Sequence, residues 1–173
     1  MFNDQRSKRV ILAAHCVLNQ NAKIDRCAFY PGVMREVTLA ILQAGVGFVQ
    51  MPCPELMCLG LDRQARADHP GTVASEDTRV ADCMAGGAAQ RVCRQLAADL
   101  VYQIEQYRCN GFEVIGVLGI NGSPTCGVEI SWRADQEQSE PGVFIGLLQE
   151  ACRQKGIELP FRGIRAAEPQ QAL

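Results

Sequence analysis

The sequence predicts a three-layer, Rossmann-like α/β fold with a mostly parallel four-stranded sheet. Its apolar runs are short, and the clearest one, 114–120, is apolar almost throughout. Such runs are typical of strands that are buried on both faces of a parallel sheet. Amphipathic segments alternate with them in the order strand, helix, strand, helix, strand, helix, strand. Right-handed crossovers with one reversal of direction give the strand order 2-1-3-4.

The first strand is expected over 9–14, and a polar loop is expected over 17–30. Pro31 then opens a helix that Gly45 closes, because proline is favoured at the start of a helix and glycine at its end. Residues that recur every fourth position form the expected buried stripe of this helix: Val33, Val37 and Ile41.

The second strand is expected over 47–51, and the polar stretch 60–85 follows it. That stretch contains Pro70 and Gly71 and is too long for a simple connection, so it is predicted to be a lid or a partner-binding loop. The longest helix is predicted over 86–109. One face of that helix carries apolar residues at helical spacing: Val92, Leu96, Leu100 and Ile104.

After the third strand, three further elements are predicted in order: an irregular segment over 127–139, a helix over 141–155 and a last strand over 159–164. The tails 1–8 and 166–173 are expected to lie outside the packed fold. The chain of 173 residues is long enough to bury about two-thirds of its unfolded surface, so 1–173 is predicted to form a single α/β domain.

Charge and hydropathy exclude several classes of protein. The net charge of −2 gives no basic field of the kind that binds a nucleic-acid polymer. No apolar run reaches the ~18 residues that a membrane span needs. The first residues, 1–9, are polar and lack a signal-peptide core, so we expect the protein in the cytoplasm. The sequence does not indicate an oligomeric state.

Nine cysteines are the most unusual feature of the composition. Their number is odd, and a reducing compartment disfavours disulfides. No close pair has CxxC spacing, so neither a zinc ribbon nor a thioredoxin-type site has a local signature. Free cysteine often acts as a small buried hydrophobe. We predict this structural role for Cys93 and Cys152, and also for Cys27, Cys83 and Cys109.

Three other cysteines each follow a predicted strand: Cys16 the first, Cys53 the second and Cys126 the third. Parallel strands end on the same side of a sheet and neighbours lie about 4.8 Å apart, so these thiols can meet above the sheet. Three converging thiolates suit a soft metal or an iron–sulfur cluster, and three ligands leave a catalytic position open. From spacing alone, buried structural thiols remain an equal alternative.

Segments around these cysteines resemble motifs of the thiouracil desulfidase (TudS-like) family. Residues 16–25, Cys-Val-Leu-Asn-Gln-Asn-Ala-Lys-Ile-Asp, are similar to its opening motif of a cysteine followed by Leu, Asn, a basic residue and Asp. Pro52-Cys53-Pro54-Glu55 resembles its CPE motif, and residues 123–127, Ser-Pro-Thr-Cys-Gly, resemble its SPSCG motif. Gly142-Val143 and Leu147-Leu148 resemble its following helix.

The resemblance implies a [4Fe-4S] cluster that is held by Cys16, Cys53 and Cys126, with one open iron. That iron takes the sulfur of a small-molecule thio-heterocycle, a thiolated pyrimidine or a similar thio-compound. Water then replaces the sulfur at carbon, and the sulfur leaves as sulfide. The implied enzyme is therefore an iron–sulfur-dependent desulfidase.

Four other residues have expected roles in this reaction. Glu55 can act as the base on water, and Ser123 can donate a hydrogen bond to the developing anion. Asn21 and Asp25 could contact the edge of the heterocycle. Structural alternatives stay open, because Glu55 could be a helix-start carboxylate and Ser123 could cap a turn.

The sequence departs from the family pattern at several positions. His15 stands where a small residue is usual, Asn19 replaces a glycine and Thr125 replaces a serine. Basic residues before the third motif are absent. The three cysteines of the motifs are retained despite these departures, but the identity of the substrate is not determined by them. Two other functions also remain open: another open-cluster lyase or dehydratase, and a non-enzymatic protein that binds a metal or a cluster.

Overall fold

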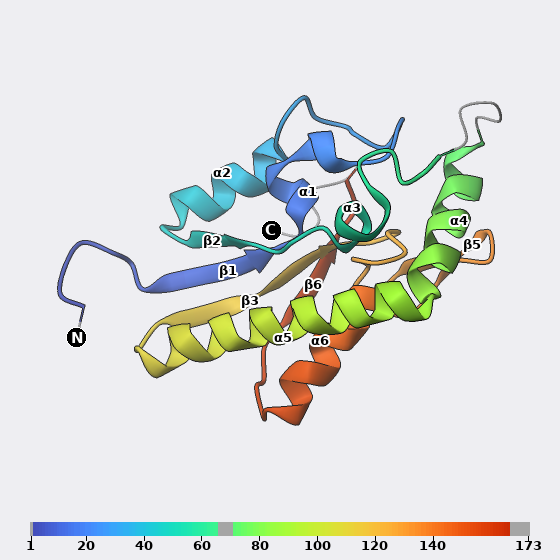
Figure 1. The fold of residues 1–173 in the computed structure, drawn as a ribbon. Helices are drawn as coiled ribbons and strands as arrows, with labels where there is room; N and C mark the ends of the chain where they lie inside the picture. Colours follow the sequence, from blue (N-terminus) through green and yellow to red (C-terminus); the bar gives the residue numbers. More distant parts are fainter. Residues whose placement is uncertain (1, 66–70, 167–173) are drawn as a thin grey trace.

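Four parallel strands form the central sheet of the computed structural model, which describes residues 2–65 and 71–166 (Figure 1). The strands are β1 (Arg9–Ala13), β2 (Gly47–Gln50), β3 (Glu113–Ile120) and β6 (Phe161–Ile164). They lie in the order β2-β1-β3-β6, and every neighbouring pair is parallel. Because β6 is the fourth strand of this sheet along the chain, the predicted order 2-1-3-4 is confirmed.

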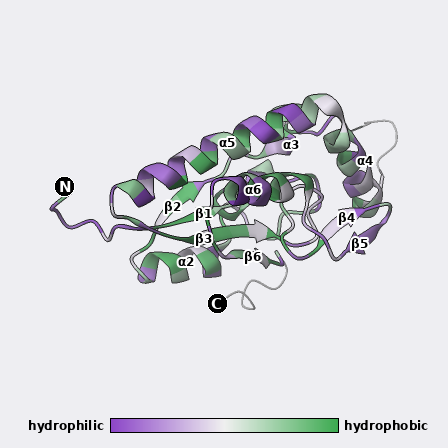
Figure 2. Ribbon diagram, turned by 90° about the horizontal axis from the view of Figure 1, so that it is seen from below, coloured by the Kyte–Doolittle hydropathy of each residue, from purple (hydrophilic) through white to green (hydrophobic). Residues whose placement is uncertain are grey.

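Helices cover both faces of this sheet, which confirms the predicted three layers. α2 (Arg35–Gln43) lies on one side of the strands and α5 (Gly87–Cys109) on the other (Figure 2). α6 (Val143–Gln154) packs against α5. One hydrophobic core joins buried side chains of the strands and of these helices, among them Leu12, Val117, Leu100, Ile104 and Phe144.

β3 is buried along almost its whole length, as its apolar sequence predicts. A Cβ atom on Gly116 would lie 2.6 Å from the carbonyl oxygen of Pro160, and one on Gly119 would overlap the carbonyl oxygen of Cys126. The two glycines therefore let the neighbouring chain approach the strand closely. Through Gly119, the strand positions the loop that carries Cys126.

The predicted long loop over 60–85 is wrong in its second half. α3 (Pro54–Leu59) precedes it, and α4 (Val73–Ala85) occupies its end. The Thr72 hydroxyl oxygen accepts a hydrogen bond from the Ser75 backbone N–H at 3.1 Å and caps α4. This cap and a periodic buried stripe outweigh the proline–glycine signal on which the loop prediction depended. The stripe consists of Val80, Ala81 and Met84, whereas 66–70 lie outside the described residues.

The segments on either side of the first crossover also differ from the prediction. α2 begins at Arg35 rather than at Pro31, so Val33 precedes the helix and is 39% exposed. The segment predicted as a polar loop after the first strand holds two short elements, α1 (His15–Leu18) and the 3-10 helix η1 (Gln20–Ala22). These elements are shorter than a periodic apolar pattern can indicate.

The segment 127–139, predicted to be irregular, contains an antiparallel hairpin of β4 (Ser131–Arg133) and β5 (Gln136–Gln138). Its two turn residues, Ala134 and Asp135, have positive φ angles of 51° and 59°. Two-residue hairpin turns of this kind usually carry Asn or Gly. The sequence therefore lacks the turn signal that would have predicted the hairpin.

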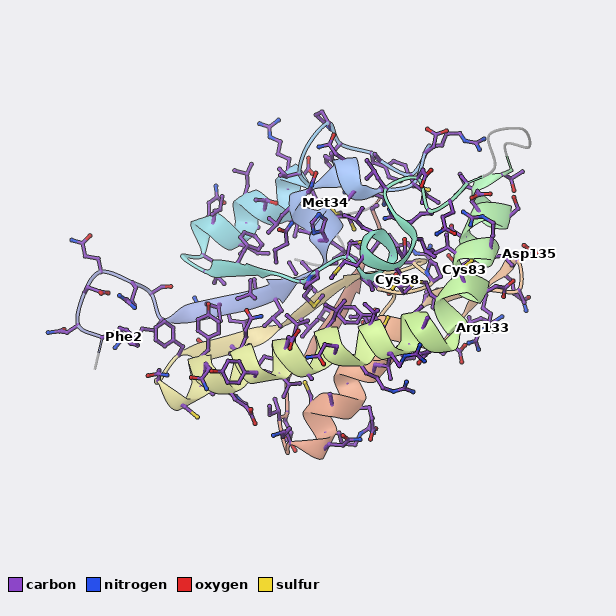
Figure 3. All side chains as sticks on the ribbon, in the orientation of Figure 1. Phe2, Met34, Cys58, Cys83, Arg133 and Asp135 are labelled. Atoms are coloured by element: carbon purple, nitrogen blue, oxygen red, sulfur yellow. The ribbon has the colours of Figure 1, made fainter. Side chains whose placement is uncertain are left out.

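The two expected tails are the segments 1–8 and 166–173. Residues 2–8 form no helix or strand, and Phe2 lies at the end of the molecule opposite Asp135 and Cys83 (Figure 3). The tail predicted over 166–173 lies outside the described residues except for Ala166, which is buried. Among the described helices, none is both long and apolar enough to cross a membrane.

Candidate functional site

The carboxyl ends of the strands open into a cavity of about 500 Å³. Its walls include Cys16, Cys53 and Cys126, so the predicted convergence of the three strand-end thiols is confirmed. Glu55 and Ser123, the predicted base and hydrogen-bond donor, line the same cavity. The structure thus assembles the candidate ligands and the candidate catalytic residues, whose roles stay predictions.

The loop after β1 places Cys16 at the cavity. The hydrogen bonds between β1 and β3 continue just past the end of β1, where the Ala14 N–H donates to the Leu118 carbonyl at 2.8 Å. Gln20 then closes the loop, with a side chain that is only 1% exposed. Its Nε2 donates to the Cys16 carbonyl at 2.6 Å, and its Oε1 accepts from the Phe29 N–H at 3.2 Å. This buried amide fixes the backbone that carries the first thiol.

The loop 123–127, which carries Cys126, is held by the start of α6. Backbone N–H groups at a helix start have no partner within the helix. Here they donate to the carbonyl groups of the loop: Gly142 to Gly127 at 3.0 Å, Val143 to Pro124 at 3.1 Å, and Phe144 and Ile145 to Thr125 at 3.1 and 3.2 Å. The helix therefore orders the loop through its own unpaired donors.

Ser123 organises the same loop from within. Its Oγ atom accepts hydrogen bonds from the backbone N–H groups of Cys126 at 3.0 Å and Thr125 at 3.3 Å. The turn-capping alternative for Ser123 is therefore correct. Its hydroxyl proton remains available for a further hydrogen bond, because both of these contacts use the oxygen as an acceptor.

Cys53 lies immediately before α3 and caps it. Its Sγ atom accepts a hydrogen bond from the Leu56 backbone N–H at 3.5 Å, and Pro54 begins the helix. Glu55 follows in the first turn, where a carboxylate interacts favourably with the helix dipole. The helix-start role of Glu55 is thus correct, and the same side chain also lines the cavity.

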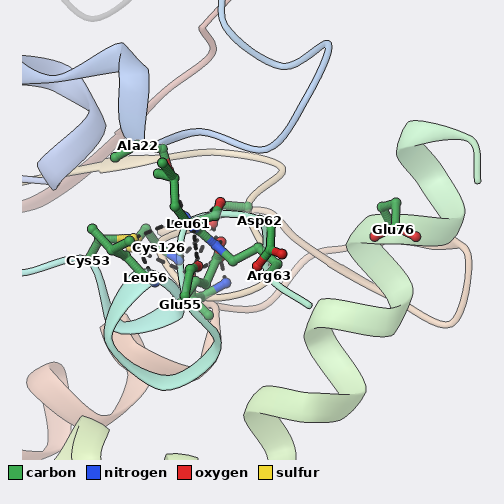
Figure 4. A network of polar contacts seen from close by, with 12 residues as sticks. Ala22, Cys53, Glu55, Leu56, Leu61, Asp62, Arg63, Glu76 and Cys126 are labelled. Atoms are coloured by element: carbon green, nitrogen blue, oxygen red, sulfur yellow. Dashed lines mark hydrogen bonds and ion pairs between the residues drawn. The ribbon is translucent and has the colours of Figure 1, made fainter. Parts of the chain in front are cut away.

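Arg63 is the centre of the polar network that Figure 4 shows. Its side chain is 1% exposed, and its guanidinium is fully engaged. Nε pairs with Glu55 at 3.2 Å, and Nη2 lies 3.5 Å from the Cys53 sulfur. The remaining donors contact backbone carbonyl groups: Ala22 at 2.6 Å, Gly60 at 2.8 Å and Leu61 at 2.9 Å. Arg63 therefore brings a buried positive charge to the thiols.

Thr125 links Glu55 to the third thiol. Its hydroxyl donates to the second carboxylate oxygen of Glu55 and lies 3.7 Å from the Cys126 sulfur. Ser123 Oγ is 3.3 Å from the Thr125 hydroxyl. Because a threonine hydroxyl has one proton, it cannot donate to Glu55 and to Cys126 at once. Ser123, Thr125 and Glu55 therefore form a chain of hydrogen-bonded groups along the cavity wall.

Burial changes the acidity of all three thiols. It raises the pKa of Cys16 to about 11, with a smaller contribution from the neighbouring Cys53. It also raises the pKa of Cys53, and it raises that of Cys126 well above its usual range, where Cys53 and Cys16 add to the shift. The three sulfurs would repel one another as thiolates. A bound cationic metal would relieve this repulsion, so metal binding would release protons.

The donor set and its surroundings fit an iron–sulfur cluster. Hydrogen bonds to sulfur, such as those from Leu56 N–H and Arg63 to Cys53, are the contacts that orient thiolate ligands and tune a cluster. Within the described residues, no group of three or more His, Cys, Asp or Glu side chains is placed to hold a single metal ion. A single zinc needs its sulfurs about 2.3 Å from one point, whereas a cluster spreads its thiolates over several irons.

The two predicted contacts to the heterocycle do not reach the cavity walls. Asp25 has a side chain that is 92% exposed and pairs with Arg26 at 3.5 Å. Asn21 is exposed, and its amide bonds to the Asn19 side chain at 3.1 Å. The tight η1 turn directs Asn21 outward and presents the following residues instead, since Lys23 and Arg26 line the cavity. The prediction for Asn21 and Asp25 is therefore wrong for this structure.

The remaining cysteines divide differently from the prediction. Cys93 and Cys152 are buried in α5 and α6, as predicted. Cys83 and Cys109 are exposed, so a buried structural role is wrong for both: Cys83 lies in α4 and Cys109 ends α5. Cys27 is only half-buried and lines the cavity. Cys83, Cys93 and Cys152 lie within helices and have no turn residues beside them that would distinguish buried from exposed positions in the sequence.

Sequence reasoning missed most of the charged residues of the cavity, among them Arg63 and Asp77. Both fall in the stretch that was predicted to be a loop. A signal for the second was present, because Thr72 precedes apolar residues at helical spacing. No local signal marks Arg63, since its burial depends on carbonyl groups that come from two separate segments.

No protein-family model matches this chain, and no solved structure matches it. The chain is similar to MJ0003, an uncharacterized protein of Methanocaldococcus jannaschii, with which it is 28% identical over 123 residues. The matched region covers 71% of this chain and 70% of that protein. The similarity extends over most of both chains and assigns no activity to either.

Proposed function

We propose that this protein is an iron–sulfur-dependent desulfidase, which removes sulfur from a thiolated pyrimidine or a similar thio-compound and releases it as sulfide. One observation carries the proposal: cysteines from three strand ends line one cavity together with Glu55 and Ser123. These residues are the ones that the resemblance to the thiouracil desulfidase family singles out. All nine cysteines are free, which agrees with the reducing cytoplasm as the proposed location.

The cofactor of this proposal is a [4Fe-4S] cluster on Cys16, Cys53 and Cys126. When bound, it supplies an open iron that acts as a Lewis acid toward the thione sulfur. Arg63 places a positive charge beside Cys53 and offsets the negative charge of the thiolates.

The proton chemistry is assigned to Glu55 and Ser123. Arg63 pairs with one carboxylate oxygen of Glu55 and Thr125 donates to the other, so the carboxylate is fixed in the cavity wall. From there Glu55 accepts a proton from the attacking water. Ser123 turns its hydroxyl proton from the Thr125 oxygen to the negative charge that develops on the substrate.

The walls of the cavity suit a flat heterocycle. A volume of about 500 Å³ lies in the range of small-molecule sites. Apolar and aromatic side chains from separate elements supply flat surfaces: Phe29, Val73, Ile120 and Trp132. Such walls exclude bulk water from the reacting carbon, which strengthens the electrostatic effect of the charged groups.

Anaerobic reconstitution of the protein with iron and sulfide tests the cofactor and the activity in one series. We expect iron and acid-labile sulfide in the ratio of a [4Fe-4S] cluster, and sulfide release from 2-thiouracil or 4-thiouracil. Loss of water from a hydroxy acid without sulfide release would favour a cluster-dependent dehydratase instead. Protein that takes up zinc but no iron would favour a non-enzymatic binding role.

Cysteine variants test the ligand set. Cys16→Ser, Cys53→Ser and Cys126→Ser should each remove or cripple the cluster, because an alkoxide is a poor substitute for a soft thiolate. Cys93→Ser and Cys152→Ser are matched controls, since both thiols are buried in helices away from the cavity walls. Equal iron loss in all of these variants would contradict the assignment.

A further inference from the structure

Besides Glu55, and Glu137 that pairs with Arg165, the cavity is lined by the carboxyl group of Asp77. Asp77 lies on α4, one helical turn after Val73, and both side chains reach the cavity wall. Residues four positions apart lie on the same face of a helix. The core stripe of α4, Val80, Ala81 and Met84, continues the same face toward the end of the helix. The first half of this face is therefore a wall of the site, and the second half packs in the core.

α4 is anchored at the position next to Asp77. The hydroxyl of Thr78 accepts hydrogen bonds from the Trp132 indole N–H at 2.9 Å and from the Asp135 backbone N–H at 3.0 Å. The same hydroxyl donates to the Asp135 carboxylate at 2.8 Å. The β4–β5 hairpin therefore fixes the rotation of α4 about its axis, and with it the direction of Asp77.

The surroundings of Asp77 differ from those of Glu55. Within residues 2–65 and 71–166, the Asp77 carboxyl group makes no hydrogen bond or ion pair. The charged or titratable groups that act on it are Glu55 from α3, Lys23 after η1, Cys27 and its neighbour Glu76. Burial, reinforced by Glu55 and opposed by Lys23, raises the pKa of Asp77 to about 7.

We infer that Asp77 is the proton donor of this site and acts opposite Glu55, which is the proton acceptor. The inference rests on the proposed function and extends it to a residue outside the three family-like motifs. Two carboxyl groups whose environments differ in this way are the usual arrangement of a general acid and a general base. Arg63 and Thr125 both donate to the Glu55 carboxylate, whereas within the described residues no donor contacts the Asp77 carboxyl group and only Lys23 offsets a charge on it.

The proton steps balance without an oxidant or a reductant. Water forms a carbon–oxygen bond at the thione carbon while Glu55 takes one of its protons. Asp77 gives its proton to the sulfur, the carbon–sulfur bond breaks, and the sulfur leaves with the bonding electron pair as hydrosulfide. The new hydroxyl group returns a proton to Asp77 as the carbonyl forms, and Glu55 loses its proton to solvent.

The first experiment is a pH profile of sulfide release with the reconstituted protein and thiouracil. The wild-type rate should fall above about pH 7 as Asp77 loses its proton. Asp77→Asn should lower the rate at pH 6 by about a hundredfold and remove this fall. Asp82→Asn, an exposed position on the same helix, is the matched control and should leave rate and profile unchanged.

Glu55→Gln separates the two roles. It should also lower the rate by about a hundredfold, but it should keep the fall at high pH because Asp77 is intact. If the wild type releases sulfide and Asp77→Asn keeps its rate and profile, the inference is overturned while the proposed function stands. If the wild type releases no sulfide from any thione, the proposed function is overturned.

The second experiment does not depend on activity. Carbon-13 NMR of the Asp carboxyl groups, in the protein without substrate, should show one Asp that titrates close to pH 7 and is absent in Asp77→Asn. Asp82→Asn should retain that signal. An Asp77 signal that titrates below pH 5 would overturn the inference, because the group would be charged at neutral pH and could not donate a proton.

Discussion

Two walls of the cavity are held in place in different ways. One is the loop 123–127, which carries Cys126. Many backbone hydrogen bonds fix it, since the first N–H groups of α6 donate to its carbonyl groups. The contact with α6 leaves no gap, because a Cβ atom on Gly142 would lie 2.5 Å from the carbonyl carbon of Thr125. No single side chain determines the shape of this wall.

The other wall is the segment around Arg63. Its backbone is left-handed at Gly60, Arg63 and Gln64, with φ angles of 83°, 55° and 58°. For the two residues that are not glycine, this conformation costs about 1 kcal/mol or more each. The guanidinium of Arg63 compensates by donating to the carbonyl groups of Gly60 and Leu61. One wall therefore depends on many small contributions and the other on one residue.

The largest effect is expected from Arg63→Met. It keeps the unbranched apolar stem of the side chain but leaves the Glu55 carboxylate and several carbonyl groups without their donor. Removal of one partner from a buried ion pair typically costs 3–5 kcal/mol, so we expect a loss of about 4 kcal/mol in the free energy of unfolding. Chemical denaturation measures this loss.

Two further variants control this prediction. Arg79→Met breaks the partly exposed pair with Glu76 on α4 and should cost only about 0.5 kcal/mol. Adding Glu55→Gln to Arg63→Met should recover stability, because it removes the charge that was left unpaired. Strictly additive losses in the double variant would show that Arg63 acts through the carbonyl groups alone.

Gly142→Ala tests the other wall and should cost about 2 kcal/mol. The new methyl group would meet the backbone of Thr125 at 2.5 Å, and backbone cannot move aside as a side chain can. Gly146→Ala is the matched control on α6, since its Cβ atom would first meet Pro141 at an ordinary 3.7 Å. The control should gain up to about 1 kcal/mol, as alanine favours a helix. Losses of equal size would argue against a close contact at Gly142.

The same contrast explains what the sequence could predict. The strands, their order and the convergence of Cys16, Cys53 and Cys126 follow from apolar runs and from the geometry of parallel sheets. Those rules depend on regular structure, which a local pattern specifies. The loop that carries Cys126 was predictable as a tight turn for the same reason, because Pro124 and Gly127 mark it.

The wall around Arg63 was not predictable in this way. The burial of Arg63 depends on carbonyl groups of Ala22 and Gly60, which lie in segments that only the folded chain brings together. Asn21 and Asp25 were expected to contact the heterocycle as polar residues of the motif-like segment after Cys16, but a 3-10 turn changes which side chains face inward. Sequence spacing predicts proximity in the chain and not the direction of a side chain.

Thr125→Val should have a smaller effect on stability than the changes at Arg63 and Gly142. It keeps the shape of the side chain but removes the hydroxyl that donates to Glu55, and a lost hydrogen bond to a charged group costs about 1.5 kcal/mol. Thr125→Ser, which keeps the hydroxyl and loses the methyl group, should cost about half as much. Thermal and chemical denaturation compare the two. A larger loss in Thr125→Ser than in Thr125→Val would show that packing of the methyl group outweighs the hydrogen bond to Glu55.

The last comparison needs no substitution. The rate of alkylation of each cysteine in the wild-type protein at pH 8 should distinguish the exposed thiols from those of the cavity. Cys83 and Cys109 are exposed and should react first. Cys16 should react at least about a hundredfold more slowly, because a rise of its pKa from 9.0 to about 11 lowers its thiolate fraction by about that factor. Mass spectrometry of digested samples assigns each rate to its cysteine.

The same labelling experiment in Arg63→Met tests whether the two walls are independent. Loss of the guanidinium frees the segment beside Cys53, so we expect faster alkylation of Cys53. Cys126 should keep its slow rate, because its loop is held by α6 and by Ser123 rather than by Arg63. Equal acceleration of both thiols would mean that the walls open together. In that case Arg63 would hold both walls, and the backbone hydrogen bonds of the loop 123–127 would not suffice to keep that wall closed.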